Sequence, residues 1–170
     1  MVEVFKYYAK CNKIINAQMI EAIGKGGGDL YNLPSDGYFK SIGVILEHIY
    51  GADSLFFKVF SEIGPYPSRN APVFAERKER KEKLFDDLKE FAEARTRLDD
   101  AIVQLASEIK EEDLPKTFVR TTRSGEKQER IFWKALMHVF NHETHHRGQI
   151  AQILDQLKVQ NDYSNMIRIE

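Results

Sequence analysis

The run His138-Val-Phe-Asn-His142-Glu-Thr-His145-His146-Arg-Gly-Gln149 indicates how this chain folds, and it holds four of its five histidines. A helix advances about 100° per residue, so His142 and His146 lie one above the other on one face. On a helical wheel this pair borders the apolar stripe, whereas His138 and His145 fall further toward solvent. The run therefore predicts a helix that presents two imidazoles to the interior of a helical protein, and neutral imidazole is the commonest metal ligand.

Outward from this run, hydrophobic periodicity predicts helices at about residues 2–23, 38–63, 74–109 and 132–159. Clusters of glycine and proline, at residues 24–28 and 64–67, end the first two. Four amphipathic helices of this length predict an all-α fold, a four-helix bundle. A length of 170 residues predicts a single domain over residues 1–170.

The connections between the predicted helices differ in kind. The Pro-rich segment after the second helix is longer than a tight turn needs, so we expect a long crossover between helices 2 and 3 that makes them parallel. The charged run at 76–83 is expected to be a solvated helix face. Residues 117–122 and 126–132, around Arg123-Ser124-Gly125, predict a small hairpin before helix 4. An isolated hairpin is marginal in water, so this one should pack against the helices.

Composition limits the possible environments and partners. The net charge of −1 gives no electrostatic reason to expect nucleic acid or an anionic membrane as a partner. The single Cys11 excludes an internal disulfide and is typical of a reducing cytoplasm, and it falls on the apolar stripe of the first helix. We expect no signal peptide and no membrane span, because no segment approaches about 20 uncharged apolar residues. These features predict a cytoplasmic protein.

The fifth histidine, His48, lies at the edge of an apolar face in the second predicted helix. Together with His142 and His146 it would give three neutral imidazoles from two helices, which is a catalytic type of metal site with a fourth position open. Zinc or nickel would suit such a site, and the order of metal affinities does not choose between them. The alternative is a set of hydrogen-bonded or surface histidines. For His48 taken by itself that alternative is the better one.

Two other metal-binding sequence motifs also match residues of this run. Residues 142–146 match the H-E-x-x-H pattern of zinc proteases, in which the glutamate is a general base, but the spacing of the extended protease motif is broken by Arg147-Gly148-Gln149. Glu143-x-x-His146 matches half of a di-iron site, but a second copy is lacking. Glu143 falls within the apolar arc, so it should not be buried unpaired. We expect it to bond a ligand histidine, pair with Arg147 or a neighbouring helix, or act as a base.

Residues 133–150, with the motif N-H-x-x-H-H-R-G-Q, and Leu46-Glu47-His48-Ile49 followed by Asp53, resemble the DinB family of the DinB/YfiT-like superfamily. The resemblance spans most of the chain. It implies a four-helix bundle, often dimeric, with a long crossover and a divalent metal, commonly zinc or nickel. The three metal-binding histidines fall on His48, His142 and His146. The family includes DNA-damage-inducible proteins, and the wider superfamily includes thiol-dependent transferases and isomerases that use mycothiol, bacillithiol or glutathione.

These observations predict a metal-dependent thiol S-transferase. A low-molecular-weight thiol would lose its proton at the open metal position and attack an electrophile such as an epoxide, a halide or an activated alkene. One alternative is a hydrolase that uses a metal-bound water with Glu143 as its catalytic base. A second alternative is a non-catalytic, stress-induced metal-binding bundle. The expected partners are the thiol, the electrophile and a second copy of the chain, with Tyr50, Asp53 and Arg147 as candidate substrate contacts.

Overall fold

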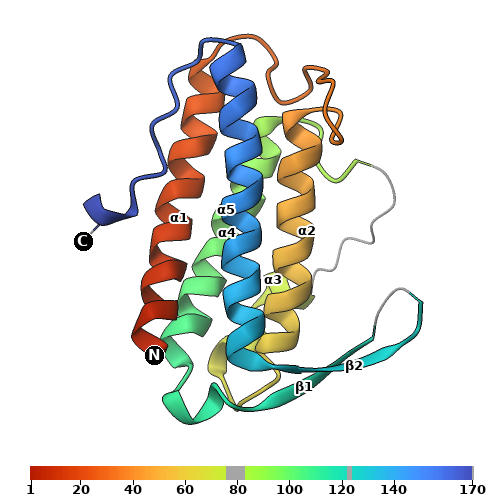
Figure 1. Cartoon of the computed structure of the whole chain (residues 1–170), viewed down its shortest axis with the longest axis vertical. Helices are drawn as coiled ribbons and strands as arrows, with labels where there is room; N and C mark the ends of the chain where they lie inside the picture. The colour runs from red at the N-terminus through yellow and green to blue at the C-terminus, as the bar shows by residue number, and fades with distance from the viewer. Residues whose placement is uncertain (76–82, 122–123, 170) are drawn as a thin grey trace.

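The computed structural model describes residues 1–75, 83–121 and 124–169, and it is mostly helical with one small two-stranded sheet. Four long helices lie side by side (Figure 1): α1 (Val2–Lys25), α2 (Ile42–Phe60), α4 (Leu88–Glu108) and α5 (Phe132–Gln156). The shorter elements are α3 (Pro72–Ala75), η1 (Pro67–Asn70), η2 (Glu111–Asp113), η3 (Met166–Arg168), β1 (Thr117–Thr121) and β2 (Lys127–Ile131). The expectation of a mostly helical fold with a small hairpin before the last long helix is confirmed. Among the described residues, no helix is long and apolar enough to cross a membrane.

Each long helix packs against two neighbours. Helices α1 and α2 each contact both α4 and α5, so the four form a closed ring. In Figure 1, α1 and α5 run upward from their first residues, whereas α2 and α4 run downward. Helices α2 and α4 are therefore parallel. The charged run expected at 76–83 falls almost wholly on residues 76–82, which lie outside the described residues.

The third long helix begins fourteen residues later than the predicted start at Phe74, at Leu88. The side chain of Asp87 accepts a hydrogen bond from the Glu90 backbone N–H at 2.8 Å, and the Glu90 carboxylate accepts one from the Asp86 backbone N–H at 2.9 Å. These bonds satisfy N–H groups that a helix start leaves free, which fixes the first turn here. The predicted start at Phe74 is wrong because that segment forms the separate short helix α3.

The second helix begins at Ile42 and not near Tyr38, because Ser41 caps it by accepting a hydrogen bond from the Val44 backbone N–H at 3.2 Å. Helix α2 ends at Phe60 and α5 at Gln156, each about three residues before its predicted end. Differences of this size are usual at helix ends, which fray and tighten.

The inward face of α1 differs from the stripe that periodicity predicts. Val4 lies on the same predicted stripe as Cys11, at i, i+7 spacing, but it is 51% exposed, whereas Phe5 and Ala9 are buried. Cys11 is buried and unpaired, as expected. Helix α1 packs against both α4 and α5, so its buried face is wider than a single stripe.

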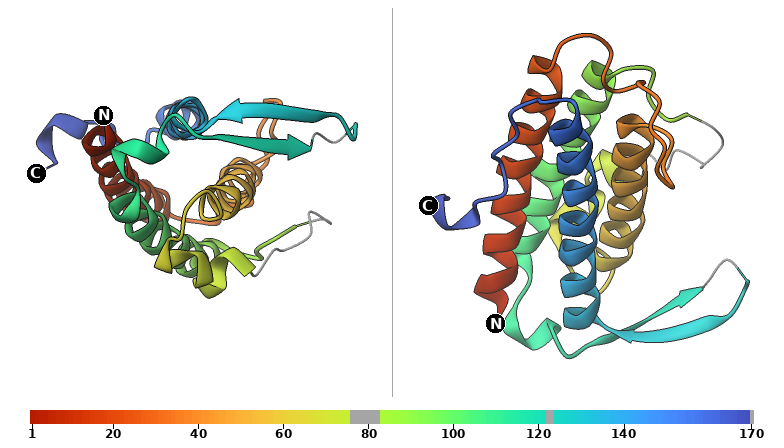
Figure 2. Two further views of the ribbon diagram at one scale, coloured as in Figure 1. Left: turned by 90° about the horizontal axis from the view of Figure 1, so that it is seen from below. Right: turned by 45° about the horizontal axis from the view of Figure 1, so that its top comes forward.

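The hairpin extends from the base of α5 beyond α2 (Figure 2). Strands β1 and β2 pair antiparallel, and Gly125 takes a φ of 84° in the turn between them, a conformation that favours glycine. The ring of Phe118 packs on that of Phe60 with centroids 5.7 Å apart. The expectation that the helices support the hairpin is thus confirmed.

The first turns of α2 contact two loops at the end of the molecule opposite the hairpin, the loop before α2 and the loop before α4. Gly43 donates its backbone N–H to the Tyr31 carbonyl at 2.8 Å, and a Cβ at this position would come within 2.7–2.9 Å of the Tyr31 ring. The Tyr31 hydroxyl donates to Glu47 Oε1 at 3.0 Å, and the same oxygen accepts from the Phe85 backbone N–H at 3.2 Å. Glu47, which directly precedes His48, therefore binds both the loop before α2 and the loop before α4.

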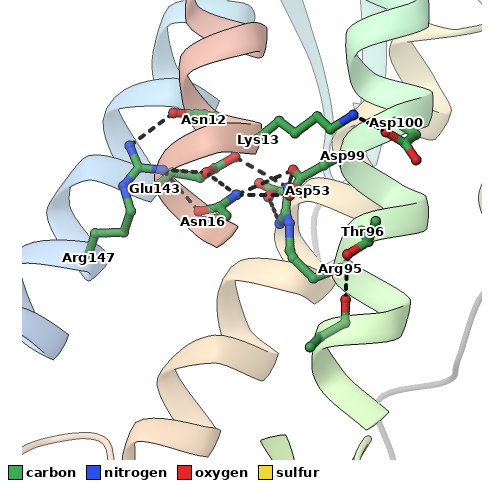
Figure 3. Close-up of polar contacts among 11 residues, drawn as sticks. Asn12, Lys13, Asn16, Asp53, Arg95, Thr96, Asp99, Asp100, Glu143 and Arg147 are labelled. Carbon is green, nitrogen blue, oxygen red and sulfur yellow. Dashed lines mark hydrogen bonds and ion pairs between the residues drawn. The ribbon is translucent and has the colours of Figure 1, made fainter. Parts of the chain in front are cut away.

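A buried ion network joins all four long helices (Figure 3). It contains one or two residues from each helix: Asn12, Asn16, Asp53, Arg95, Asp99, Glu143 and Arg147. Arg95, only 2% exposed, donates to Asp53 and Asp99. Arg147 donates to Glu143 at 2.7 Å and to Asn12 at 2.9 Å. Charged groups can be buried in this way only when positive and negative charges are paired, because an unpaired buried charge is strongly destabilising.

The network holds two guanidinium groups and three carboxyl groups. Burial, and then the charge of Glu143, raises the pKa of Asp53 well above its usual value. Although burial opposes it, the charges of Arg95 and Arg147 lower the pKa of Glu143. Asp53 is therefore the carboxyl group that most readily keeps a proton, and with that proton the network is electrically neutral.

Replacing Arg95 should strongly destabilise the fold. Arg95→Met leaves Asp53 and Asp99 buried without their cation, which is expected to lower the free energy of unfolding by about 3–5 kcal/mol. Urea denaturation monitored by circular dichroism measures the change. The control is Lys13→Met, which removes the half-exposed Lys13–Asp100 pair that also joins α1 to α4. It should cost no more than about 1 kcal/mol, and equal losses in the two variants would contradict a structural role for the network.

Candidate metal centre

Three histidines meet where α2 packs against α5. Nε2 of His142 lies 3.0 Å from Nε2 of His48 and 3.0 Å from Nε2 of His146. One ligand atom from each residue can be chosen so that all three lie within 4.8 Å of one another. Although His48 and His142 are 94 positions apart in the chain, the structure brings together the same three histidines that the sequence predicts as ligands.

The spacing of these nitrogens suits a divalent metal. Zinc–nitrogen bonds of about 2.0–2.1 Å in a tetrahedral site place neighbouring nitrogens about 3.3 Å apart. The observed separations of 3.0 Å need only a small opening of the cluster. A three-nitrogen set leaves a further coordination position, as catalytic sites require. The cluster is therefore compatible with a metal site, and its nitrogen donors suit zinc or nickel.

The protonation of the rings also favours metal binding. Burial, followed by the charges of His146 and His48, lowers the pKa of His142 to about 4. Burial likewise lowers the pKa of His146. Both rings are therefore neutral near pH 7, and only a neutral imidazole has a nitrogen lone pair to offer a metal.

Gln149 orients one of the predicted ligands. Its side-chain Oε1 lies 2.8 Å from Nδ1 of His146, so it accepts a hydrogen bond when that nitrogen carries the proton. This tautomer directs the lone pair of Nε2 toward His48 and His142. The amide nitrogen of Gln149 lies 3.3 Å from Nε2 of His145. Such hydrogen bonds fix the orientation of a metal-binding ring, and the spacing H-x-x-Q on a helix was a signal that the sequence already contained.

Phe39 covers one side of the cluster. Its ring centroid lies 5.1 Å from that of His48 and 5.4 Å from that of His146. The second predicted helix included this residue, whereas the structure places it in the loop before α2, so sequence reasoning did not find its contact with the cluster. An aromatic ring in this position limits the access of water and ligands from the N-terminal end of α2.

The remaining two histidines of the run lie outside the cluster. His138 and His145 are both exposed, as the helical wheel predicts. The ring of His138 lies 6.1 Å from that of His142, and the ring of His145 lies 4.9 Å from that of His146. They border the site, whereas His146 is 6% exposed.

Glu143 points into the buried ion network (Figure 3). Its carboxylate accepts from Arg147 at 2.7 Å and from Asn16 at 3.3 Å, and none of its described hydrogen bonds or ion pairs involves a histidine. Of the roles expected for this residue, the structure shows the pairing with Arg147 and an ion pair with Arg95 of the neighbouring helix α4 at 3.8 Å. A role as catalytic base stays a prediction.

The candidate substrate contacts named from the sequence are engaged inside the core. Asp53 and Arg147 belong to the buried ion network, and Tyr50 packs its ring against Phe85 at 5.1 Å. Apart from Glu143, sequence reasoning missed the network partners of Asp53 and Arg147. The missed residues form two polar pairs at i, i+4 spacing, Asn12 with Asn16 and Arg95 with Asp99. Polar pairs at helical spacing within an apolar stripe were the signal available for them.

The letters H-E-x-x-H-R on α5 therefore combine two interleaved pairs. His142 and His146 face α2, and Glu143 and Arg147 follow them about 100° around the helix, facing the interior. The match to the zinc-protease pattern arises because each histidine is followed directly by one member of an ion pair.

Acidification should destabilise the metal-free chain, and should do so less after His142→Asn. An unfolded histidine binds a proton near pH 6.5, whereas the folded chain lowers the pKa of His142 to about 4. Between these values the unfolded state binds more protons, so the free energy of unfolding falls as the pH falls. Urea denaturation at about pH 7 and about pH 5 measures this difference. His145→Asn, which removes an exposed ring, should keep the wild-type dependence, and an unchanged dependence in His142→Asn would contradict the prediction.

Loss of the Gln149 side chain should weaken metal binding. Gln149→Leu removes the acceptor that orients His146, which is expected to lower metal affinity by about 10–100-fold. Competition with a chelating dye measures the affinity. Gln152→Leu is the matched control, because Gln152 is exposed on the same helix, and its affinity should equal that of the wild type. Equal affinities in all three proteins would show that His146 does not depend on this bond.

Comparison with known proteins agrees with the resemblance carried by the histidine motifs. The family model described as the DinB family matches residues 1–164, a range that includes all three clustered histidines. No curated protein and no solved structure matches the chain. Because the family match covers nearly the whole sequence, the chain belongs to the DinB family.

Proposed function

We propose that this chain is a divalent-metal-dependent thiol S-transferase built on a single four-helix bundle domain. His48, His142 and His146 would hold zinc or nickel. The substrates would be a low-molecular-weight thiol and a small electrophile such as an epoxide, a halide or an activated alkene. A cytoplasmic location and a homodimeric state stay predictions.

The donor set is the observation that carries this proposal. All three clustered ligand atoms are imidazole nitrogens, and the adjacent Glu143 is neutralised by Arg147 inside the core. A divalent metal bound there keeps its full positive charge, which lowers the pKa of a thiol at the open position and so supplies a thiolate at neutral pH.

The chain's own residues provide orientation and shielding, and the sulfur must come from outside. Gln149 orients His146, and Phe39 shields the cluster on one side. Cys11 is fully buried in α1, so it is not available as a nucleophile. A thiol co-substrate is therefore the sulfur source that agrees best with this arrangement.

The alternative is metal-assisted hydrolysis with Glu143 as the general base. A general base must reach the proton it removes, at about 2.6–3.2 Å or through one water. The carboxylate of Glu143 is held by Arg147 and Asn16 in the buried ion network, which disfavours this role. A stress-induced protein in which a metal only ties α2 to α5 is the second alternative.

Three variants and a thiol panel test the proposal. The protein, purified without histidine tags or chelators, is analysed for metal and then assayed with a dinitrophenyl halide and several thiols. We expect about one metal per chain and turnover that requires a thiol. His48→Gln should lose both metal and turnover, whereas His138→Gln, which replaces an exposed histidine one turn from His142, should keep the metal.

Glu143→Gln separates transfer from hydrolysis. Thiol-dependent turnover should survive this change, because Asp53 can ionise when the neighbouring charge is removed and so restore the balance of the network. Thermal unfolding of the variant verifies that it folds. Turnover without thiol that disappears in Glu143→Gln would support hydrolysis instead. Metal binding that raises stability without any turnover would support the non-catalytic alternative, and absence of metal would reject all three.

A further inference from the structure

A line of three contacts leads from the histidine cluster to the hairpin. The ring of His142 lies 6.1 Å from that of His138, which lies 5.7 Å from the ring of Phe56. The guanidinium carbon of Arg120, on β1, lies 4.6 Å from the centre of the Phe56 ring. We call His138, Phe56 and Arg120 the aromatic track. It joins α5, α2 and β1 on one side of the molecule.

The cluster is closed at one end and continues into the track at the other. Phe39 precedes α2 and contacts His48 and His146. Phe56 lies eight residues after His48, about two turns further along α2, and His138 lies one turn before His142 on the antiparallel α5. Both steps lead toward the hairpin that precedes α5. A ligand that extends from the cluster along the aromatic track would reach Arg120.

Arg120 has the chemistry of an anion-binding group. Its guanidinium carbon lies over the Phe56 ring. A guanidinium that stacks on a ring through its face keeps the N–H donors at its edge available. Arg120 makes no ion pair within the described residues, and it is exposed. The neighbouring Arg130 differs, because it donates to the Gln128 side chain and to the Glu129 carbonyl. A planar guanidinium held at a fixed place binds a carboxylate with two parallel hydrogen bonds.

We infer that the thiol taken by this site carries a carboxylate, and that Arg120 binds it at the hairpin end of the aromatic track. The inference rests on the proposed function, because it assumes that the sulfur lies at the histidine cluster. The contacts of 6.1, 5.7 and 4.6 Å that separate the two ends set the length of the ligand. Laid end to end these contacts are about 16 Å long, which is the reach of about five extended residues, whereas a two- or three-carbon thiol acid is too short.

A series of synthetic thiols tests this assignment. Mercaptopropionic, mercaptohexanoic and mercaptoundecanoic acids are compared with mercaptopropanol, mercaptohexanol and mercaptoundecanol. Each acid and alcohol differ only in the charged end. Isothermal titration calorimetry on the zinc-loaded full chain measures the dissociation constants. We expect at least one of the two longer acids to bind about tenfold more tightly than its alcohol, since it gains a charge-assisted hydrogen bond in a partly exposed place. The propionic acid should show no preference of this kind.

Two hairpin variants identify the residue. Arg120→Gln should abolish the preference for the longer acid. Lys127→Gln removes the same charge from the opposite face of the same hairpin, because Thr121 and Lys127 pair directly while Arg120 pairs with Gln128. It should keep the preference. Circular dichroism and the metal content verify that both variants fold and load normally.

The outcomes separate this inference from the proposed function. If each acid binds as tightly as its alcohol in the wild type, or if the preference survives in Arg120→Gln, the carboxylate assignment is wrong while thiol binding at the metal stands. If a short acid gains as much as a long one, the anion is bound near the metal and the assignment to Arg120 is again wrong. If neither acids nor alcohols bind the zinc-loaded chain, the proposed function and this inference are both wrong.

Discussion

The pairing of Glu143 with Arg147 inside the core sets the rotation of α5 on which the other features of the site depend. Arg147 reaches Asn12 and Asn16 on α1, and Glu143 lies within 3.8 Å of Arg95 on α4. Turning α5 about its axis would leave these charged groups buried without partners, which costs far more than losing an apolar contact. With α5 held in this way, the residues directly before Glu143 and Arg147 face α2. The buried ion network therefore orients His142 and His146 toward α2.

The parts of the fold that follow from local spacing could be predicted from the sequence. Helical periodicity located the four long helices. The position of each histidine relative to the apolar stripe selected His142 and His146 over His138 and His145, because the angle between side chains on a helix is nearly constant. The start of α4 could also have been found, since Asp87-Leu-Lys-Glu90 has the spacing of a capping box. The longer predicted helix resulted from extending the helical pattern back through residues 83–87, which the structure shows to be non-helical.

The parts that depend on contacts between distant segments could not be predicted. Phe39 stands in a loop whose position is fixed by the approach of Tyr31 to Gly43 and Glu47. Hydrophobic periodicity treats polar residues as exposed, so Arg95 and Asp99 read as surface positions on α4 although both are buried. Likewise, Arg120 gains its place over Phe56 only because the hairpin packs on Phe60 through Phe118. Each of these positions is a property of the assembled helices.

The long sequence separation within the histidine cluster makes a bound ion a cross-link. Two histidines one turn apart can bind a cation on a single nascent helix, but His48 is 94 positions from His142. In an unfolded chain, closing that loop costs conformational entropy, so a three-nitrogen site exists almost only in the folded chain. A ligand that binds the folded state alone stabilises it by mass action. Metal supply in the cell would then govern how long the folded chain survives, quite apart from any reaction at the site.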